Sequence, residues 1–307
     1  MTGAAGTIDQ KGIFLIWLPL AAMWVLMSVE MPVVNAFIAR MPEASRNLAA
    51  FGVTCSICLI IESPVIQLLT AATALIRGPM SYRRLLSFVH ILAAGLAGIH
   101  LLFGASPLYR FVLVTIMKVP EEIVSISRVS FLIMLPWTPA IAYRRLWQGM
   151  LIGYRRTAVV PVTMAVRIGA SVLILVAGYF IGGVSGGVLG GISLAGGVTA
   201  GAAASWWFTR PVRKIDFAGE SPQDREIGWG MLLRFYVPLA LTSFINLAAR
   251  SILTLGIGRA PHPLESLAVW PVLTSFIFIF QSLTMSYQEA VISLLSTGDR
   301  YAGLRLF

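Results

Sequence analysis

Charged side chains are scarce in this chain of 307 residues, where they make up only 12% of the sequence. Soluble domains contain about 25% charged residues, so the composition argues against a protein with a fully hydrated surface. Apolar residues account for 57% of the chain and fall into long runs, a pattern that is typical of helices crossing a membrane. The sequence therefore predicts an integral membrane protein that is built mostly of helices.

Residues with catalytic or metal-binding chemistry are also few. The three histidines are scattered, and no Ser/His/Asp set or pair of catalytic carboxylates is visible. The paired glycines within 182–197 lack the strand and the Lys-Ser/Thr of a phosphate-binding loop, so we assign them to close helix packing. Cys55 and Cys58 form one C-x-x-C, either a redox pair or, as we favour, two small residues packed in an apolar helix. We expect no enzyme activity, no cofactor and no metal site.

Windows of about 20 largely apolar residues, the length that crosses a bilayer, indicate eight membrane spans. They cover residues 13–38, 48–76, 86–106, 128–150, 157–181, 184–208, 230–258 and 266–295. The fourth is the weakest because two prolines and two arginines interrupt it, namely Pro136, Pro139, Arg144 and Arg145. The semi-apolar stretch 107–127 before it is expected to lie along the membrane surface.

Basic residues are distributed unevenly between the two sides of these spans. Of the 23 Lys and Arg residues, 15 lie on the side of the N-terminus, including Arg144 and Arg145, and six on the other side. The positive-inside rule then predicts a multi-pass protein of the plasma or inner membrane with a cytoplasmic N-terminus. Most of the net charge of +10 is explained in this way, and without a dense basic patch we expect no nucleic-acid partner.

An internal repeat relates the two ends of the chain. At an offset of 219 residues, Pro19–Ala21 matches Pro238–Ala240 and Arg40 matches Arg259. This offset contains six spans, an even number, so both copies enter the membrane in the same direction, as parallel repeats do.

The repeat also predicts how the chain is organised. We expect an all-α polytopic membrane protein with a six-helix bundle over 1–209, a cytoplasmic linker over 210–228, and the first two helices of a second bundle over 229–307. A complete second copy would extend beyond Phe307, so the chain is expected to be truncated after the eighth helix of a twelve-helix protein.

Polar residues inside the spans are candidates for a binding site, because an intramembrane charge is costly and must face a bundle interior or a wet cavity. Helical spacing places Ser56, Ser63, Gln67 and Thr70 on one face. The repeat offset carries this polar face to 275–289, so the two stripes either line a shared cavity or bond neighbouring helices. The predicted substrate-binding residues are Glu30, Asn35, Glu62, Gln67, Arg167, Arg250, Gln281 and Glu289.

Two pairings of the intramembrane charges remain open. Glu30 aligns with Ala249, next to Arg250, so Glu30 and Arg250 either share one cavity, paired or binding an anion in turn, or make local pairs within their own bundles. Arg167 either binds substrate or neutralises Glu62.

The sequence resembles the MOP exporter superfamily, which includes multidrug and toxin extruders, lipid-linked oligosaccharide flippases and progressive ankylosis transporters, and it is most similar to the last group. Scattered positions over most of the chain carry this likeness: Phe14–Arg40 with Pro19, Glu30 and Asn35; Leu48–Tyr82 with Glu62–Pro64; Arg145–Arg167 with Gln148 and Gly149; and Val237–Ala240.

The resemblance implies a secondary active transporter in which two helical bundles alternate around a central cavity. Its substrate would be a small organic anion such as citrate, a nucleotide or pyrophosphate, with a coupling ion as a further partner. Alternatives are a lipid-linked oligosaccharide flippase, a multidrug extruder, or a membrane scaffold that does not transport. Glu30 stands in a helix where cation-coupled extruders have an Asp, and no span contains an Asp, which speaks against a proton- or sodium-coupled drug extruder.

Overall fold

The computed structural model describes residues 10–217, 224 and 226–295, without the side chains of 215, 216, 250, 251, 289 and 292–295. Every regular element in this part of the chain is helical. The α-helices are α1 (Gln10–Ile38), α2 (Ala44–Glu62), α3 (Leu68–Leu75), α4 (Pro79–Ala105), α5 (Pro107–Arg110), α6 (Glu121–Ile133), α7 (Trp137–Gly153), α8 (Val160–Ile181), α9 (Gly186–Phe208), α10 (Trp229–Ile257) and α11 (Pro263–Leu295). Short 3₁₀ or π turns are η1 (Ser63–Val65), η2 (Phe111–Ile116), η3 (Thr157–Val159) and η4 (Val212–Asp216).

The eight predicted spans correspond to the long apolar helices of the described chain. Seven are long and apolar enough to cross a membrane, and α6 with α7 makes an eighth if the two form one broken span. These two helices are bent by 41° relative to each other, next to Pro136, which lacks the amide hydrogen that would continue α6. This is the span that the sequence indicates as weakest, and it begins at Glu121 rather than at residue 128.

A second break divides the span that contains α2 and α3. The helix α2 ends at Glu62, η1 contains Pro64, and α3 begins at Leu68. Pro32, by contrast, lies inside α1 without ending it. The prolines of the spans therefore act differently, and the break at Pro64 adjoins two of the predicted site residues, Glu62 and Gln67.

The stretch 107–127 is not one surface segment, as the sequence predicts, but two elements. Residues 107–116 form a short apolar helix, and residues from 121 onward already belong to α6. Tyr109 of the short helix is buried, and its hydroxyl is hydrogen-bonded to Ser127 Oγ of α6 at 2.6 Å. The apolar stretch therefore packs onto the bundle through its buried face.

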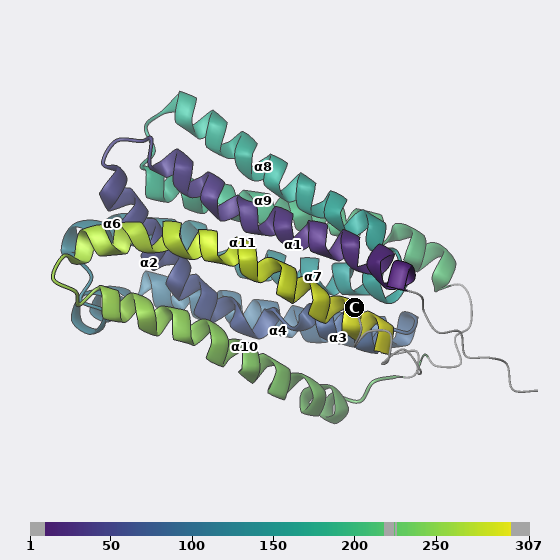
Figure 1. Ribbon diagram of the computed structural model, residues 1–307. Coiled ribbons are helices and arrows are strands. Elements are labelled where there is room, and N and C mark those ends of the chain that lie inside the picture. The colour runs from purple at the N-terminus through teal and green to yellow at the C-terminus, as the bar shows by residue number, and fades with distance from the viewer. Residues whose placement is uncertain (1–9, 218–223, 225, 296–307) are drawn as a thin grey trace, which may run out of the picture.

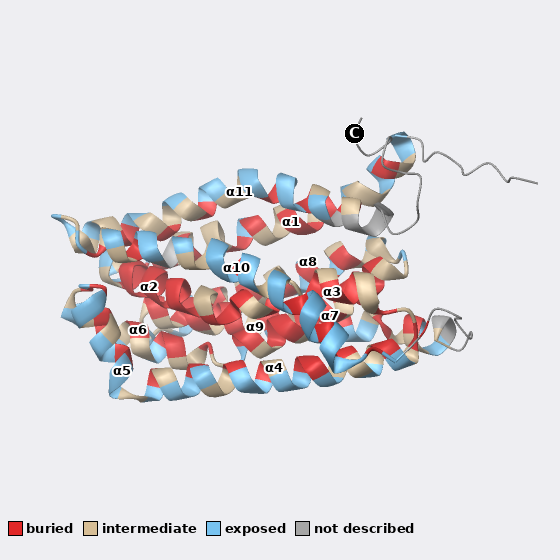
Figure 2. Ribbon diagram, turned by 90° about the horizontal axis from the view of Figure 1, so that it is seen from below, coloured by how far each residue is buried: buried red, intermediate tan, exposed pale blue. Residues whose placement is uncertain are grey.

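The helices α2, α7 and α9 form the centre of the molecule (Figure 1). Figure 2 shows buried residues concentrated on them, whereas α4, α10 and α11 have exposed outer faces. The glycines of α9 allow this packing: a Cβ atom at Gly190 would lie 2.8 Å from the Phe51 ring, and one at Gly191 would lie 2.5 Å from Ser130 Oγ. The prediction of close helix packing is thus confirmed for the glycines within α9.

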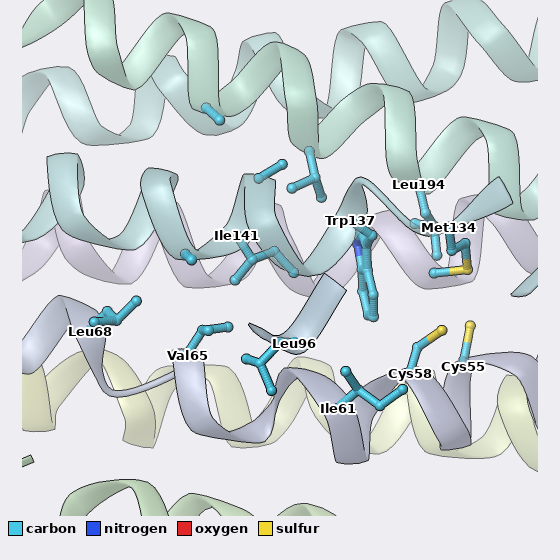
Figure 3. Packing of buried hydrophobic residues seen from close by; sticks show 14 of the residues in the cluster. Cys55, Cys58, Ile61, Val65, Leu68, Leu96, Met134, Trp137, Ile141 and Leu194 are labelled. Atoms are coloured by element: carbon cyan, nitrogen blue, oxygen red, sulfur yellow. The ribbon is translucent and has the colours of Figure 1, made fainter. Parts of the chain in front are cut away.

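The two cysteines are both buried and form no disulfide. Figure 3 shows their sulfur atoms on the side of α2 that faces Met134 and Trp137. Within the described chain, no group of three His, Cys, Asp or Glu side chains is placed to hold a metal ion. This packing supports the interpretation of the C-x-x-C as two small core residues.

The internal repeat is visible in the direction of the helices. The helices α1 and α10 run in the same direction, and α2 and α11 run in the opposite one (Figure 1). The helices α1 and α2 contact their repeat equivalents α10 and α11 across one interface, in which α1 lies against α11 and α2 lies against α10. This is the relation that parallel repeats require.

Polar contacts across this interface follow the 219-residue offset. Asn35 of α1 donates a hydrogen bond to Ser275 Oγ of α11 at 3.4 Å. The residues equivalent to these two, Thr254 of α10 and Ser56 of α2, are hydrogen-bonded to each other at 2.9 Å. The same contact is therefore made twice, once on each side of a pseudo-twofold axis.

The position of the axis follows from a residue that contacts its own equivalent. Gly52 of α2 and Pro271 of α11 are related by the offset, and a Cβ atom at Gly52 would lie 3.1 Å from the Pro271 ring. The axis therefore passes between these two residues, where the absence of a side chain at Gly52 leaves room for the Pro271 ring.

Asp224, in the segment between α9 and α10, caps the N-terminus of α4. Its carboxylate accepts hydrogen bonds from the backbone amides of Met80 and Ser81 at 2.9 and 3.0 Å and from Ser81 Oγ at 2.7 Å. Burial by itself raises the pKa of Asp224, but these three hydrogen bonds outweigh it, so the pKa lies below its ordinary value. The bound carboxylate is thus stabilised in its charged form.

Replacing Asp224 by alanine is expected to lower the free energy of unfolding by about 1–2 kcal/mol, because the first turn of α4 loses its cap. A lowered pKa means that this stabilisation is present above the ordinary aspartate pKa and is lost as the pH falls through the folded-state value. Unfolding in mixed micelles at neutral and acidic pH measures both effects.

Glu226→Ala is the matched control. Glu226 pairs with Arg84 of α4, the helix that Asp224 caps, but its side chain is 67% exposed. We expect this variant to change stability by less than about 1 kcal/mol. Equal losses for the two variants, or a loss for Asp224→Ala that persists at low pH, would contradict the role of Asp224 as an ionised cap.

Candidate functional site

A cavity of about 340 Å³ lies between the first nine helices and the pair α10 and α11. It adjoins the pseudo-twofold axis, since Gly52 and Pro271 both line it. Side chains from α1, α2, α3, α7, α8 and α9 form one wall, and side chains from α10 and α11 form the other. The cavity is therefore lined from both repeats, which is one of the two interpretations of the polar stripes that the sequence leaves open.

The wall opposite α10 and α11 carries all the charged side chains that line the cavity in the described part of the chain. Each is almost fully buried, with exposed fractions between 1% and 5%. They are Glu30 of α1, Glu62 of α2, Arg144 and Arg145 of α7, and Arg167 of α8.

Glu30 and Arg167 form a buried ion pair between α1 and α8. Arg167 donates from Nε to Glu30 Oε1 at 3.0 Å and from Nη2 to Oε2. Ser171, one turn further along α8, donates to Glu30 Oε1 at 3.0 Å and also lies 2.9 Å from the Ser193 carbonyl of α9. The pair thus holds three helices of one bundle together.

This geometry gives Glu30 a partner that the sequence does not indicate. Glu30 of α1 pairs with Arg167 of α8. Arg167 is bonded to Glu30 rather than to Glu62, although it still lines the cavity. The side chain of Arg250 lies outside the described residues.

Arg144 is a buried cation without an ion pair to any described carboxylate. Its Nη1 donates to Gln148 Oε1 at 3.1 Å and lies 3.3 Å from the sulfur of Met164. Its Nε is buried and has no hydrogen-bond partner. Because an arginine stays charged, this side chain brings an incompletely compensated charge to the cavity wall.

Arg145 and Glu62 lie beside this cation. The Arg145 guanidinium is 5.3 Å from the centre of the Trp24 ring, a cation–π distance. Glu62 also lines the cavity, and its buried Oε2 has no hydrogen-bond partner. The arginines of α7 and the carboxylate of α2 therefore face the same space.

Four of the predicted site residues line the cavity, namely Glu30, Glu62, Gln67 and Arg167. Gln67 also donates from Nε2 to Ser243 Oγ of α10 at 2.9 Å, so it connects the two walls.

Of the remaining predicted residues, Asn35 and Gln281 do not line the cavity, and the side chains of Arg250 and Glu289 are not described. Asn35 donates to the Pro271 carbonyl of α11 at 3.1 Å and thus serves the interface between the repeats. Gln281 is exposed on α11 and is not among the residues lining the cavity. The side chain of Glu289 lies outside the described residues.

The two polar stripes contribute only in part. Ser56, Gln67, Thr70 and Ser275 line the cavity. The hydroxyls of Ser63, Ser282 and Ser286 instead donate to carbonyl oxygens within or just before their own helices. Ser56 and Ser275 are also bonded to Thr254 and Asn35 of neighbouring helices, and Ser286 accepts a hydrogen bond from Trp17 Nε1 of α1 at 2.9 Å. Both interpretations of the stripes therefore hold, each for some of the residues.

The arginines of α7 correct the sequence-based interpretation. The charge distribution places Arg144 and Arg145 among the loops and helix ends on the side of the N-terminus, yet they are 1% and 4% exposed. The bend between α6 and α7 brings α7 inward, which a continuous span from residue 128 does not anticipate. A usable signal exists, because Trp137, Ile141 and Arg144 recur at helical spacing on one face, and all three line the cavity.

No family model matches the chain, and no curated protein matches its sequence. Its fold is similar to that of the MATE multidrug transporter DinF-BH in complex with R6G, with a TM-score of 0.71, 15% identity, and coverage of 95% of this chain and 66% of that one. The fold is also similar to that of the eukaryotic MATE transporter AtDTX14, with a TM-score of 0.66, 15% identity, and coverage of 96% of this chain and 67% of that one. For a MOP superfamily transporter from Pyrococcus furiosus, the TM-score is 0.52 and the identity 15%, with coverage of 94% of this chain and 70% of that one.

The chain thus spans about two thirds of the length of the solved structures that it matches. The likeness extends over nearly all of the chain and includes the helices that surround the cavity. The chain is a multi-pass, all-helical membrane protein with the fold of the MATE transporters of the MOP superfamily.

Proposed function

We propose that this protein is a secondary transporter that moves a small organic anion across the plasma or inner membrane. In this proposal residues 1–209 form one bundle, residues 210–228 form a cytoplasmic linker, and residues 229–307 belong to the second bundle. The cavity between the bundles binds the substrate, and the bundles rock about it to give access from alternate sides.

The observation that carries the proposal is the buried Arg144 guanidinium. A charge taken out of water costs several kcal/mol unless it is paired, and Arg144 lines the cavity with no described carboxylate bonded to it. Arg145 adds a second cation beside it. An anionic group in the cavity would satisfy the unused Nε of Arg144 and neutralise its charge.

The interface between the repeats supports the rocking motion. Gly52 and Pro271 pack against each other at the pseudo-twofold axis, and the polar contacts of the interface include the two equivalent ones on either side. Pro64 also interrupts the hydrogen bonding of the span beside the cavity. An interface of this kind allows the two packed units to move against each other as rigid bodies.

A counterflow assay tests the proposal without knowledge of the coupling ion. The 307-residue chain is reconstituted into vesicles preloaded with an unlabelled anion, and uptake of the same labelled anion is measured for citrate, pyrophosphate and naphthalene-1-sulfonate. We expect Arg144→Gln to reduce uptake of the transported anion at least about tenfold, as loss of a buried charge-assisted hydrogen bond does.

Arg83→Gln is the matched control, because Arg83 is an exposed arginine on α4 outside the cavity. It removes the same charge and is expected to leave uptake unchanged. Exchange of none of the three anions, or equal uptake by wild type and Arg144→Gln, would overturn the proposal.

A further inference from the structure

A second hollow lies at the end of the bundle where α5 and α6 meet the last turn of α4 (Figure 2). It has a volume of about 440 Å³, and six residues line it: Ala105, Pro107, Arg110, Phe111, Thr115 and Arg128. None of these residues lines the cavity between the repeats. The hollow is therefore a separate feature of the molecule, to which the proposed transport assigns no role.

The length of α4 places this hollow at the level of the lipid headgroups. At about 1.5 Å per residue, the 27 residues of α4 extend over roughly 40 Å, whereas the hydrocarbon core of a bilayer is about 30 Å thick. A tilt of about 20° shortens this extent by only about 2 Å. Both ends of α4 therefore reach into the headgroup layers, and Ala105 is its last residue.

Exposed apolar side chains border the hollow. Leu102 lies one helical turn before Ala105, so it is on the same face of α4, and it is 73% exposed. Phe111, which lines the hollow, is 53% exposed. At this depth such side chains contact the upper part of the acyl chains, so the surface is polar in the hollow and apolar beside it.

Arg128 of α6 is fixed against the end of α4. Its Nε donates to the Gly104 carbonyl at 2.8 Å and its Nη2 donates to the Ala105 carbonyl at 2.6 Å. The last carbonyls of a helix have no amide partner within the helix, so Arg128 serves as their cap. Its Nη1 makes no hydrogen bond within the described chain, which leaves a positioned guanidinium with free donors at the hollow.

Arg110 of α5 brings a second guanidinium to the same hollow. Its Nε donates to Glu121 Oε1 at 2.8 Å, and both side chains are more than half exposed. Among the described residues its two Nη groups have no hydrogen-bond partner. Two cations from different helices thus meet at one hollow, and Glu121 is the carboxylate bonded to one of them.

We propose that this hollow binds the headgroup phosphate of an anionic phospholipid, with the acyl chains lying along Leu102 and Phe111. Guanidinium groups bind phosphate oxygens through paired, charge-assisted hydrogen bonds, and the Thr115 hydroxyl in the lining is a further donor. The exposed apolar border favours a lipid over a soluble phosphate. The ammonium of a zwitterionic headgroup would lie beside two guanidinium groups, which favours an uncharged headgroup alcohol such as glycerol.

Protection of a cysteine in the hollow tests the proposal at the site itself. Ala105→Cys is made together with Cys55→Ala and Cys58→Ala, and its labelling by a soluble maleimide is followed on the purified 307-residue chain in dodecylmaltoside micelles. Dioleoylphosphatidylglycerol, dioleoylphosphatidylcholine or inorganic phosphate is added at one concentration. We expect phosphatidylglycerol to slow labelling at least about tenfold more than phosphatidylcholine, as charge-assisted hydrogen bonds to a bound phosphate do, and inorganic phosphate to have no effect.

Variants of the exposed ion pair should change this protection in opposite directions. Arg110→Gln removes a phosphate contact and is expected to reduce the protection about tenfold, whereas Glu121→Gln releases Arg110 and is expected to increase it about threefold. Both side chains are exposed, so neither variant should unfold the chain. Arg83→Gln, an exposed arginine in the first turns of α4, is the matched control and should leave the protection unchanged.

The results that contradict the proposal are distinct from one another. Equal protection by the two lipids would show an apolar groove that does not distinguish charge, and protection by inorganic phosphate would show a site for a soluble anion. Either result overturns the proposal, as does an absence of protection by phosphatidylglycerol. Protection that stays the same in Arg110→Gln and Glu121→Gln would show that the lipid lies elsewhere and would overturn it as well.

Discussion

The Glu30→Gln variant is expected to lose about 3–5 kcal/mol of its free energy of unfolding, the cost of leaving one partner of a buried ion pair alone. Glu30 and Arg167 are 2% and 5% exposed, so water cannot solvate the Arg167 charge that the substitution leaves unpaired. Glutamine keeps the shape of the side chain, which isolates the effect of the charge. Equilibrium unfolding in mixed dodecylmaltoside and SDS micelles, followed by tryptophan fluorescence, measures the difference.

Two further variants separate the ion pair from its surroundings. Ser171→Ala removes one hydrogen bond to Glu30 and should cost only about 0.5–1.5 kcal/mol. The double variant E30Q/R167Q removes both charges and should be more stable than E30Q, because no unpaired charge stays buried. Losses that simply add in the double variant would show that the two side chains act independently.

The membrane topology was largely predictable because it depends on local composition. A run of about 20 apolar residues must cross the bilayer as a helix wherever it occurs, and each predicted span has its counterpart in the described chain. The break between α6 and α7 was visible as Pro136, but its angle depends on how α7 packs against α3 and α9. Such packing is not encoded within the span itself.

The repeat carried tertiary information that composition does not. Because equivalent residues must occupy equivalent places, the offset that pairs Asn35 with Thr254 also pairs Ser275 with Ser56, and these residues meet across the interface. The repeat did not say which polar residues face the cavity and which serve the interface. Asn35 is an example, since the repeat does not show that its side chain contacts α11.

The charged wall of the cavity was only half predictable. Glu30, Glu62 and Arg167 stand out because a charge within an apolar run needs a reason. The partner of Glu30 lies 137 residues away in the sequence, and no local pattern selects Arg167 over Arg250. Arg144 and Arg145 were hidden for a different reason, because arginines near a span end are ordinarily topological signals.

Replacing Gly149 by valine is expected to cost about 3 kcal/mol of stability, at the upper end of overpacking effects. Gly149 of α7 faces α3 so closely that a Cβ atom would lie 2.5 Å from the Leu69 carbonyl oxygen and 2.6 Å from Ala72 Cβ. The Gly149 carbonyl also accepts a hydrogen bond from Thr73 Oγ1 at 3.2 Å. Neither obstacle is the end of a flexible side chain, so α7 must move away from α3.

This displacement should reach the binding site as well. Arg145 lies one helical turn before Gly149 on α7, so a shift of the helix moves the arginines relative to Glu62. We therefore expect Gly149→Val to weaken binding of naphthalene-1-sulfonate in the fraction that stays folded, by about tenfold or more. Unfolding in mixed micelles and titration calorimetry measure the two effects separately.

Gly169→Ala is the matched control, because a Cβ atom at Gly169 of α8 meets nothing within 4 Å. Alanine at such an open helical site should leave stability unchanged or raise it by about 0.5–1 kcal/mol, since glycine is the poorer helix former. Gly149→Ala should fall between the two, because its single Cβ atom already meets the Leu69 carbonyl. Equal stability of Gly149→Ala and Gly169→Ala would show that the contact between α7 and α3 is looser than described, and the arginines would then not owe their position to it.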